Sequence, residues 1–491
     1  MASPYETVIG LEVHAQLLTA SKLFCGCATR FGAEPNTQVC PVCLALPGTL
    51  PVPNRKAVEL AVRAGLALGC SIRPRSIFAR KNYFYPDLPK GYQISQYELP
   101  ICEHGKLEIE VDGARRSVRI LRAHMEEDAA KNLHGSGAGS RTLVDFNRGG
   151  VPLIEIVSEP DLRSSAEAEE YLKRLREILM FAGVNDGNLE EGSFRCDANV
   201  SIRPVGATEL GTRTELKNIN SFRFVRKAID YEVARQQALV SSGGKVRQET
   251  RTYSDAQGKT LPMRSKEEAM DYRYFPDPDL PPIVVSEEEV ARAREALPEL
   301  PAQKRARWQG ELGLTVADAA VLTAHPALAK LLERTTRALL DASAGKLELP
   351  KAGKRAANFI QAELLGHVKL EGLSADLRLT PEALAQLLWL VESGEISGKI
   401  AKEVFTDMLS SGRAARQIVS EKGLAQVSDD AQIEQAVRAL VAAHPENVAA
   451  YRGGKQNMLG WFVGQVMKAT SGRANPKLVN EILRRLLDEA P

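Results

Sequence analysis

The sequence predicts an α+β body, built on an antiparallel sheet, that ends near residue 290 and is followed by an all-helical arm. Several segments before residue 220 alternate apolar and polar residues, and this period of two is typical of strands that bury one face. Four prolines between Pro276 and Pro282 forbid a continuing helix and indicate an extended domain edge. Beyond them, alanine and leucine recur at helical spacing, which predicts the change of fold.

The first predicted strand, residues 9–17, carries the most informative pattern of the chain. Apolar residues alternate strictly with Glu12, His14 and Gln16. Because successive side chains of a strand point to opposite faces, Glu12 and His14 share one face, about 6 to 7 Å apart. This strand is expected to display a carboxylate and an imidazole on a rigid element.

Further acidic residues lie on other predicted strands. They are Glu126, Glu127 and Asp128 in HMEED, Glu155 in PLIEIVSEP, Asp197 in RCDANVSIR, and Glu215 beside Lys217 in RTELKN. They could form the solvated face of a sheet or a purely protein acid/base pair, although such a pair would not need so many acids. Carboxylates with lysine and arginine nearby fit magnesium–nucleotide chemistry best, because Mg²⁺ prefers oxygen ligands and the cations neutralise phosphate charge.

A phosphate-binding loop is missing from the sequence. GKT occurs at 258–260, but Tyr253 stands where the first glycine of that motif belongs, and GSGAGS at 135–140 does not fit a dinucleotide fingerprint either. GSGAGS is interpreted as a flexible turn. If the chain handles ATP, we expect it to do so on the sheet.

Four of the seven cysteines form two close pairs joined by a short loop. They are Cys25, Cys27, Cys40 and Cys43. This spacing predicts a structural zinc site with four sulfur ligands, close to Glu12 and His14. Disulfides are the alternative, but nothing else in the chain indicates secretion. The isolated cysteines, expected to be small core residues, are Cys70, Cys102 and Cys196.

Composition places the rest of the molecule. The chain has 491 residues, of which 44% are hydrophobic and 26% charged, as in an ordinary globular protein of two to four domains. It has no apolar run of membrane-spanning length and no export leader, so a cytoplasmic protein without a membrane partner is expected. Lys and Arg total 64 against 62 for Asp and Glu, so net charge says nothing about nucleic-acid binding.

The helical arm is predicted from segments 290–297, 326–340 and 381–391. Its end is basic: residues 451–491 hold seven basic and three acidic side chains. Basic groups near exposed glycine backbone suit phosphate contact, although a solvated basic surface is the alternative. The candidates for nucleic-acid contact are Arg452, Lys455, Lys468 and Arg473.

Several long motifs, in their order along the sequence, resemble those of a known family over almost the whole chain. They are IGLEVHAQL, FGAEPNT, RKNYFYPDLPKGYQISQYE, HMEEDAAK, VPLIEIVSEPD, EEGSFRCDANVSIRP, ELKNINSF and DYRYFPDPDLPP. Together they resemble the B subunits of tRNA-dependent amidotransferases. The resemblance implies a glutamine synthetase-like cradle domain (1–290), a helical domain (291–405) and a YqeY-like tail domain for tRNA recognition (406–491). It also implies ATP-dependent phosphorylation of glutamate or aspartate mischarged on tRNA(Gln) or tRNA(Asn), followed by amidation.

The resemblance also implies site residues. His14, Glu127 and Glu155 would hold the catalytic Mg²⁺, and Glu12, Asp197 and Glu215 a neighbouring divalent ion. Lys81, Lys217 and Asn218 would contact phosphate or the aminoacyl end. The four cysteines match those family members that bind Zn²⁺.

The expected protein partners follow from a catalytic signature that is absent from the sequence. The Ser–Ser–Lys signature that releases ammonia from glutamine is absent, since SSGGK at 241–245 is too short. The resemblance places this activity in a separate amidase, the A subunit, with a small C subunit that completes a heterotrimer. Two other classes remain open: a non-catalytic tRNA-binding scaffold, against which the acid and histidine set argues, and a zinc-dependent nucleic-acid binder.

Overall fold

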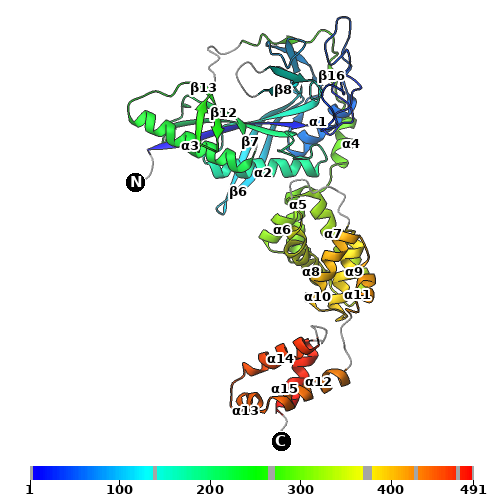
Figure 1. Ribbon diagram of the computed structural model, residues 1–491. Coiled ribbons are helices and arrows are strands. Elements are labelled where there is room, and N and C mark those ends of the chain that lie inside the picture. Colours follow the sequence, from blue (N-terminus) through cyan, green and yellow to red (C-terminus); the bar gives the residue numbers. More distant parts are fainter. Residues whose placement is uncertain are drawn as a thin grey trace. The chain divides into compact units, whose positions relative to one another are not determined.

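The computed structural model describes residues 4–135, 141–219, 221–263, 271–368, 379–424, 430–470 and 476–488. The chain divides into two compact units, Met1–Pro301 and Ala302–Pro491 (Figure 1). The first holds the sheets and the second is helical, which confirms the predicted mixed α and β body followed by a helical arm.

A nine-stranded sheet forms the first unit, in the order β14-β13-β12-β11-β1-β10-β7-β6-β2. Every pair in it is antiparallel except β12 with β13. Its strands are β1 (Tyr5–Gln16), β2 (Ser71–Ile72), β6 (Cys102–Val111), β7 (Ala114–Glu127), β10 (Pro152–Ser158), β11 (Phe194–Pro204), β12 (Thr214–Ile219), β13 (Glu249–Ser254) and β14 (Lys259–Pro262).

Smaller sheets flank this sheet. One joins β15 (Phe275–Pro276), β4 (Ala79–Asn82) and β5 (Tyr92–Ser95), and another joins β16 (Ile283–Val284) to β3 (Arg75–Ser76). A hairpin pairs β8 (Lys131–His134) with β9 (Thr142–Asp145). Strands β15 and β16 lie in the proline-rich segment, which is extended as predicted.

The apolar face of the large sheet packs on helices α1 (Arg55–Ala67), α2 (Ser165–Phe181) and α3 (Phe222–Ser241) (Figure 1). On β1 the alternate residues Ile9, Leu11 and Val13 are at most 1% exposed, and burying each such side chain contributes about 1.5 to 3 kcal/mol. The predicted alternation is therefore confirmed, and it leaves Glu12 and His14 on the opposite face.

Polar caps fix where these helices begin. Asn54, Ser164 and Ser221 each accept a hydrogen bond from a backbone N–H of the first turn of α1, α2 and α3. Helix α4 (Glu287–Glu295) begins at a capping box on Ser286, a few residues before the predicted start.

The second unit is helical throughout its described residues. Its helices are α5 (Pro301–Glu311), α6 (Val316–Leu322), α7 (Pro326–Ser343), α8 (Leu349–Ala362), the short 3₁₀ turn η1 (Leu364–Gly366), α9 (Pro381–Glu392), α10 (Gly398–Ser411), α11 (Ala415–Glu421), α12 (Asp430–Ala443), α13 (Pro445–Arg452), α14 (Met458–Ala469) and α15 (Pro476–Asp488). A core that includes Val437, Phe462 and Leu483 joins α12, α14 and α15. None of the helices in the described ranges is long and apolar enough to span a bilayer.

Candidate functional site

A row of titratable side chains crosses the open face of the large sheet. Arg195 on β11 is the register partner of His14 on β1, His14 is the partner of Glu155 on β10, and Glu155 is the partner of His124 on β7. Partners across antiparallel strands point to the same face. Four segments far apart in the sequence thus deliver a cation, an imidazole, a carboxylate and a second imidazole side by side.

Three members of this face could hold a metal ion. One ligand atom each from His14, Glu126 and Glu155 lies within 4.8 Å of the others. The His14 Nε2 atom is 3.4 Å from Glu155 Oε2, and His124 Nε2 is 3.4 Å from Glu126 and 3.5 Å from Glu155. Two carboxylates and an imidazole suit a hard divalent cation, with His124 as an outer partner that orients both acids.

Electrostatics in this cluster favour the charged carboxylate. Burial alone would raise the pKa of Glu155, but His124, His14 and Lys81 hold it well below its usual range. Burial would likewise lower the pKa of His14, but the hydrogen bond and charge of Glu155 raise it to about 9. Without a metal, His14 is therefore protonated at neutral pH and pairs with Glu155. Binding of a cation through this imidazole must release that proton.

Glu126, rather than the expected Glu127, lies with His14 and Glu155. Neighbouring residues of a strand face opposite ways, so Glu127 points to the other side of β7. There it forms an ion pair with Lys90, at 2.5 Å, and accepts a hydrogen bond from the Ile94 N–H at 2.8 Å. The period of two in HMEED could have placed Glu126 on the face of His124, but the family motif alone does not separate the two adjacent acids.

The cluster opens into a cavity of about 780 Å³. Lys81, on β4, lines it together with His14 and Glu126. Burial would lower the pKa of Lys81, but Glu126, Tyr274 and Glu155 raise it above its usual range, so its ammonium stays charged. A partly buried cation beside carboxylates is suited to contact a phosphate.

The second predicted acid group, Glu12, Asp197 and Glu215, is bridged by Lys217. The Lys217 Nζ atom lies 3.2 Å from Asp197 and 3.0 Å from Glu215. Glu12 accepts a hydrogen bond from Asn199 at 2.9 Å, and burial, then the charges of Glu155, Glu215 and Asp197, raises its pKa. An ammonium thus neutralises two of the three acids. Asn218 lies on β12, but its side chain is outside the described residues.

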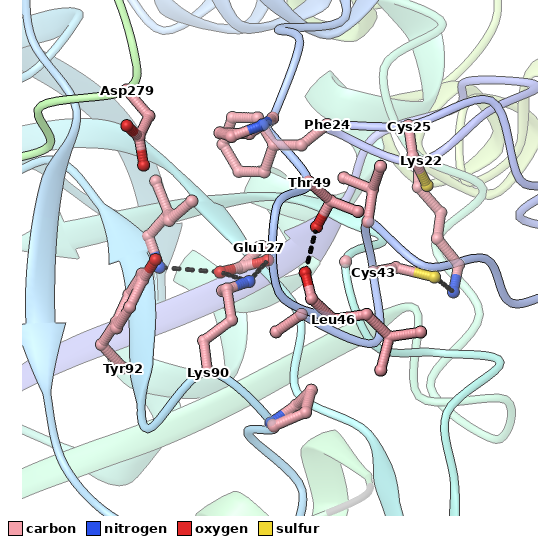
Figure 2. A pocket seen from close by; sticks show the side chains of 16 residues that line it. Lys22, Phe24, Cys25, Cys43, Leu46, Thr49, Lys90, Tyr92, Glu127 and Asp279 are labelled. Carbon is pink, nitrogen blue, oxygen red and sulfur yellow. Dashed lines mark hydrogen bonds and ion pairs between the residues drawn. The ribbon is translucent and has the colours of Figure 1, made fainter.

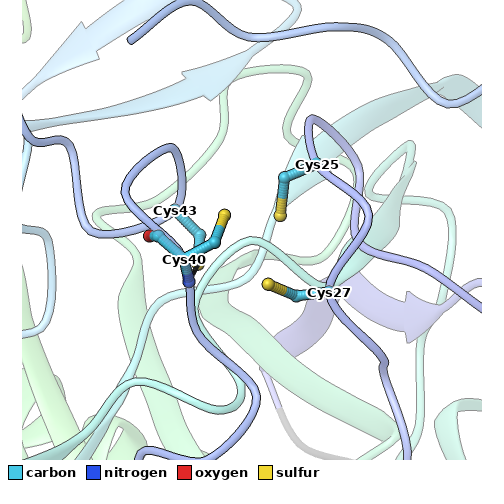
Figure 3. Close-up of side chains that lie close together, drawn as sticks. All are labelled: Cys25, Cys27, Cys40 and Cys43. Atoms are coloured by element: carbon cyan, nitrogen blue, oxygen red, sulfur yellow. Dashed lines mark hydrogen bonds between the residues drawn. The ribbon is translucent and has the colours of Figure 1, made fainter.

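The four cysteines of the predicted zinc site lie together (Figure 3). Their sulfur atoms are within 4.8 Å of one another, and none forms a disulfide. Tetrahedral zinc–sulfur geometry needs sulfurs about 3.8 Å apart, so the donor set fits the ion. The Cys40 N–H and the buried Lys22 ammonium point at Cys43 Sγ, at 3.1 and 3.6 Å, as donors that stabilise a thiolate. The isolated Cys70, Cys102 and Cys196 are buried, as predicted.

Replacing Cys43 with serine should release one equivalent of zinc and lower the melting temperature while the sheet persists, because a metal clip mainly stabilises its own loop. Metal analysis and thermal melting of purified protein would measure this. Cys70→Ala is the matched control, since this buried cysteine lies outside the cluster and should leave the zinc content unchanged. Wild-type protein without zinc, prepared without chelator, would contradict the assignment.

A second cavity, of about 240 Å³, lies between the cysteine loop and β7 (Figure 2). Glu127, Lys90 and Tyr92 line one side, and Cys25, Cys43 and Leu46 line the other. Residues Thr29 to Ala33 of the same loop line the larger cavity. The cysteine loop therefore contributes walls to both cavities, and Glu127 belongs to the smaller one.

The basic residues of the tail differ in their surroundings. Arg452 Nε donates to the Leu487 carbonyl at 3.0 Å and so binds the last turn of α15. Lys455 and Lys468 are exposed. Arg473 lies outside the described residues.

Comparison with known proteins shows the family of the chain. A GatB/GatE catalytic domain model matches residues 7–291, and a GatB domain model matches residues 344–487. The B subunit of the aspartyl/glutamyl-tRNA(Asn/Gln) amidotransferase of Syntrophotalea carbinolica is 57% identical over 488 residues, 99% of this chain and 99% of the relative. That of Solidesulfovibrio magneticus is 56% identical over 484 residues, 98% of this chain and 99% of the relative.

The two matches thus define a GatB/GatE-type catalytic domain followed by a helical GatB domain. The chain belongs to the family of aspartyl/glutamyl-tRNA(Asn/Gln) amidotransferase B subunits.

Proposed function

We propose that this chain uses ATP to phosphorylate the side-chain carboxylate of glutamate or aspartate mischarged on tRNA, and that ammonia then displaces the phosphate to give Gln-tRNA(Gln) or Asn-tRNA(Asn). The observation that carries the proposal is the cluster of His14, Glu126 and Glu155, of which His14 and Glu126 line the cavity of about 780 Å³ together with Lys81. Membership of the family supports the same reaction.

Activation is needed because a carboxylate is a poor acyl donor, whose leaving group would be oxide or hydroxide. An acyl phosphate has phosphate as its leaving group. His14, Glu126 and Glu155 would hold Mg²⁺, which neutralises charge on the phosphoryl group during transfer. Lys81 adds a fixed positive charge, and Lys217 contributes another from β12.

A second divalent ion, if it binds, would use Asp197 and Glu215 together with Glu12. Such an ion would have to displace the Lys217 ammonium, which now lies between two of these carboxylates. Zn²⁺ at the four cysteines would be structural and would fix a loop that lines both cavities. A cradle of the glutamine synthetase type fits this carboxylate-bearing sheet.

Ammonia has to come from another protein, because the amidase Ser–Ser–Lys signature is absent from the sequence. We propose two partners in a heterotrimer: an amidase, which is the A subunit of such complexes, and a small C subunit. Glutamine hydrolysis would then occur on the amidase, and ammonia would reach the acyl phosphate without escaping to water.

The proposal is tested by ATP cleavage in the assembled heterotrimer. ADP formation should require the mischarged tRNA and should proceed without glutamine, since phosphoryl transfer to the carboxylate precedes amidation. Phosphate should leave when ammonia displaces it from the acyl phosphate. Uncharged tRNA is the matched control. A non-catalytic scaffold would bind the same tRNA and form no ADP.

The tail is proposed to recognise tRNA through Lys455 and Lys468. Neutralising both should weaken binding of mischarged tRNA and flatten its salt dependence, because each lost phosphate contact removes about 0.7 to 0.9 from the slope of log affinity against log salt. Binding measured at several salt concentrations gives that slope. Arg452→Gln is the comparison: it should lower the stability of the tail through loss of its bond to Leu487. An unchanged slope in the double-lysine variant would mean that these lysines are only solvated.

A further inference from the structure

Asp128 is a buried carboxylate in the wall of the larger cavity, and it holds two arginines. Its exposed fraction is 3%. Gln16 Nε2 and Arg195 Nη2 each lie 3.0 Å from its Oδ2 atom, and Arg148 Nε lies 3.7 Å from Oδ1. Its backbone N–H and carbonyl are both hydrogen-bonded to residues 150–151, at 2.8 Å. The carboxylate is therefore fixed at its backbone and at both oxygens.

The two arginines differ in the hydrogen-bonding capacity they have left. Arg148 donates from Nε to the Ala129 carbonyl and from Nη2 to the Ala130 carbonyl, both at 2.9 Å. Arg195 Nε is buried and finds no acceptor within the part of the chain that the structure describes. One carboxylate thus faces two guanidinium groups, so these three side chains carry a net positive charge, and the spare donor is on Arg195. Buried donors are nearly always satisfied, so this one calls for an acceptor from outside the chain.

Arg195 is also next to the proposed metal ligands. It is the register partner of His14, which is the partner of Glu155. Opposed residues on antiparallel strands are separated by about 4.5 to 5.5 Å at Cα and share a face. A phosphoryl group carried to the cluster of His14, Glu126 and Glu155 would therefore come within reach of the Arg195 guanidinium.

We propose that Arg195 contacts the transferring phosphoryl group, and that Asp128 is the positioning residue that fixes the Arg195 guanidinium for this contact. The inference deepens the proposed function and rests on it. Guanidinium suits this task because its planar fork can donate two parallel hydrogen bonds to phosphate oxygens. A donor fixed before the reaction needs no reorganisation when charge develops.

The assembled heterotrimer with mischarged tRNA and ATP provides the test. Arg195→Ala should lower kcat for ADP formation about 100-fold, the cost typical of losing one preorganised donor. Arg195→Lys should lower it nearly as much, because an ammonium lacks the fork. The KM for ATP should change less than about three-fold in both variants, because the contact strengthens in the transition state.

Chemical rescue separates positioning from a merely structural role. Millimolar guanidinium ion should restore activity to Arg195→Ala, because Asp128 binds the added ion where the side chain was. It should not restore the double variant Asp128→Asn with Arg195→Ala. Asp128→Asn alone should lower kcat about 10-fold. If the double variant does not fold, the kcat of this single variant tests the role of Asp128. Asp161→Asn is the matched control, since Asp161 pairs with exposed Arg119 at 2.7 Å away from the cavity and should leave kcat unchanged.

The outcomes are distinct. A wild-type complex that cleaves no ATP with mischarged tRNA defeats the proposed function itself. An active wild type with an equally active Arg195→Ala variant overturns the role of Arg195. Full activity of Asp128→Asn, or equal rescue of the single and double variants, overturns the role of Asp128.

Discussion

Replacing Glu155 with glutamine is expected to slow mischarged-tRNA-dependent ATP cleavage about 1000-fold, since a catalytic metal contributes several kcal/mol to stabilising the transferring phosphoryl group. Glu155 is the residue of the cluster that both His14 and His124 approach, at 3.4 and 3.5 Å. The amide keeps the shape of the side chain but removes its charge, so the cluster loses a metal ligand and His14 loses its ion-pair partner. ADP formation by the reconstituted heterotrimer measures the effect.

His14→Ala should have a comparable effect, while tRNA binding and zinc content should persist in both variants. Glu103→Gln is a suitable control, because Glu103 lies on β6 of the same sheet and pairs with Arg73 at 2.8 Å, away from the cavity. Near-normal amidation by either cluster variant would refute a metal site at these residues.

The Glu126→Gln and Glu127→Gln variants are expected to differ in the Mg²⁺ concentration that they require, although the two residues are adjacent. Glu126→Gln should raise the Mg²⁺ concentration for half-maximal ATP cleavage by at least about 10-fold. In metalloproteins generally, removing even an outer partner of a metal ligand lowers metal affinity by that factor. Glu127→Gln should leave this concentration unchanged within about two-fold, because Glu127 faces Lys90 on the other side of β7. Titration of ATP cleavage with free Mg²⁺ gives both values.

Glu127→Gln can still lower overall amidation, since it leaves Lys90 without its partner in the smaller cavity. The Mg²⁺ requirement is therefore the informative measurement, and turnover is not. A raised requirement in Glu127→Gln together with a normal one in Glu126→Gln would restore the assignment expected from the family resemblance.

Local pattern was enough for some of the site. Strict alternation on β1 placed Glu12 and His14 on one face, and the spacing of the cysteines predicted the cluster that lies within 4.8 Å. Both signals are encoded within a short segment, where strand period or loop length decides the geometry. The helices that begin at Pro326 and Pro381 were also predictable locally, from alanine and leucine at helical spacing. Proline favours the first turn of a helix, which agrees with where they begin.

The other features of the site depend on pairing between segments that are far apart in the sequence. Local alternation puts Glu126 on the face of His124, but that this face meets Glu155 follows from the register of β7 with β10. Lys81 reaches the cavity from β4, which belongs to a different sheet. The bond between Asp128 and Arg195 joins residues from separate parts of the chain, as does that between Arg452 and Leu487. No local periodicity carries such information.

The fate of the side-chain oxygen tests the proposed chemistry most directly. Mischarged tRNA carrying glutamate or aspartate labelled with oxygen-18 in its side-chain carboxylate would be converted by the complete heterotrimer with ATP and glutamine, and the released phosphate examined by mass spectrometry. Phosphorylation of the carboxylate followed by displacement with ammonia predicts that one labelled oxygen appears in each phosphate released. Unlabelled phosphate, with amidated tRNA formed at the normal rate, would contradict an acyl-phosphate intermediate on this chain.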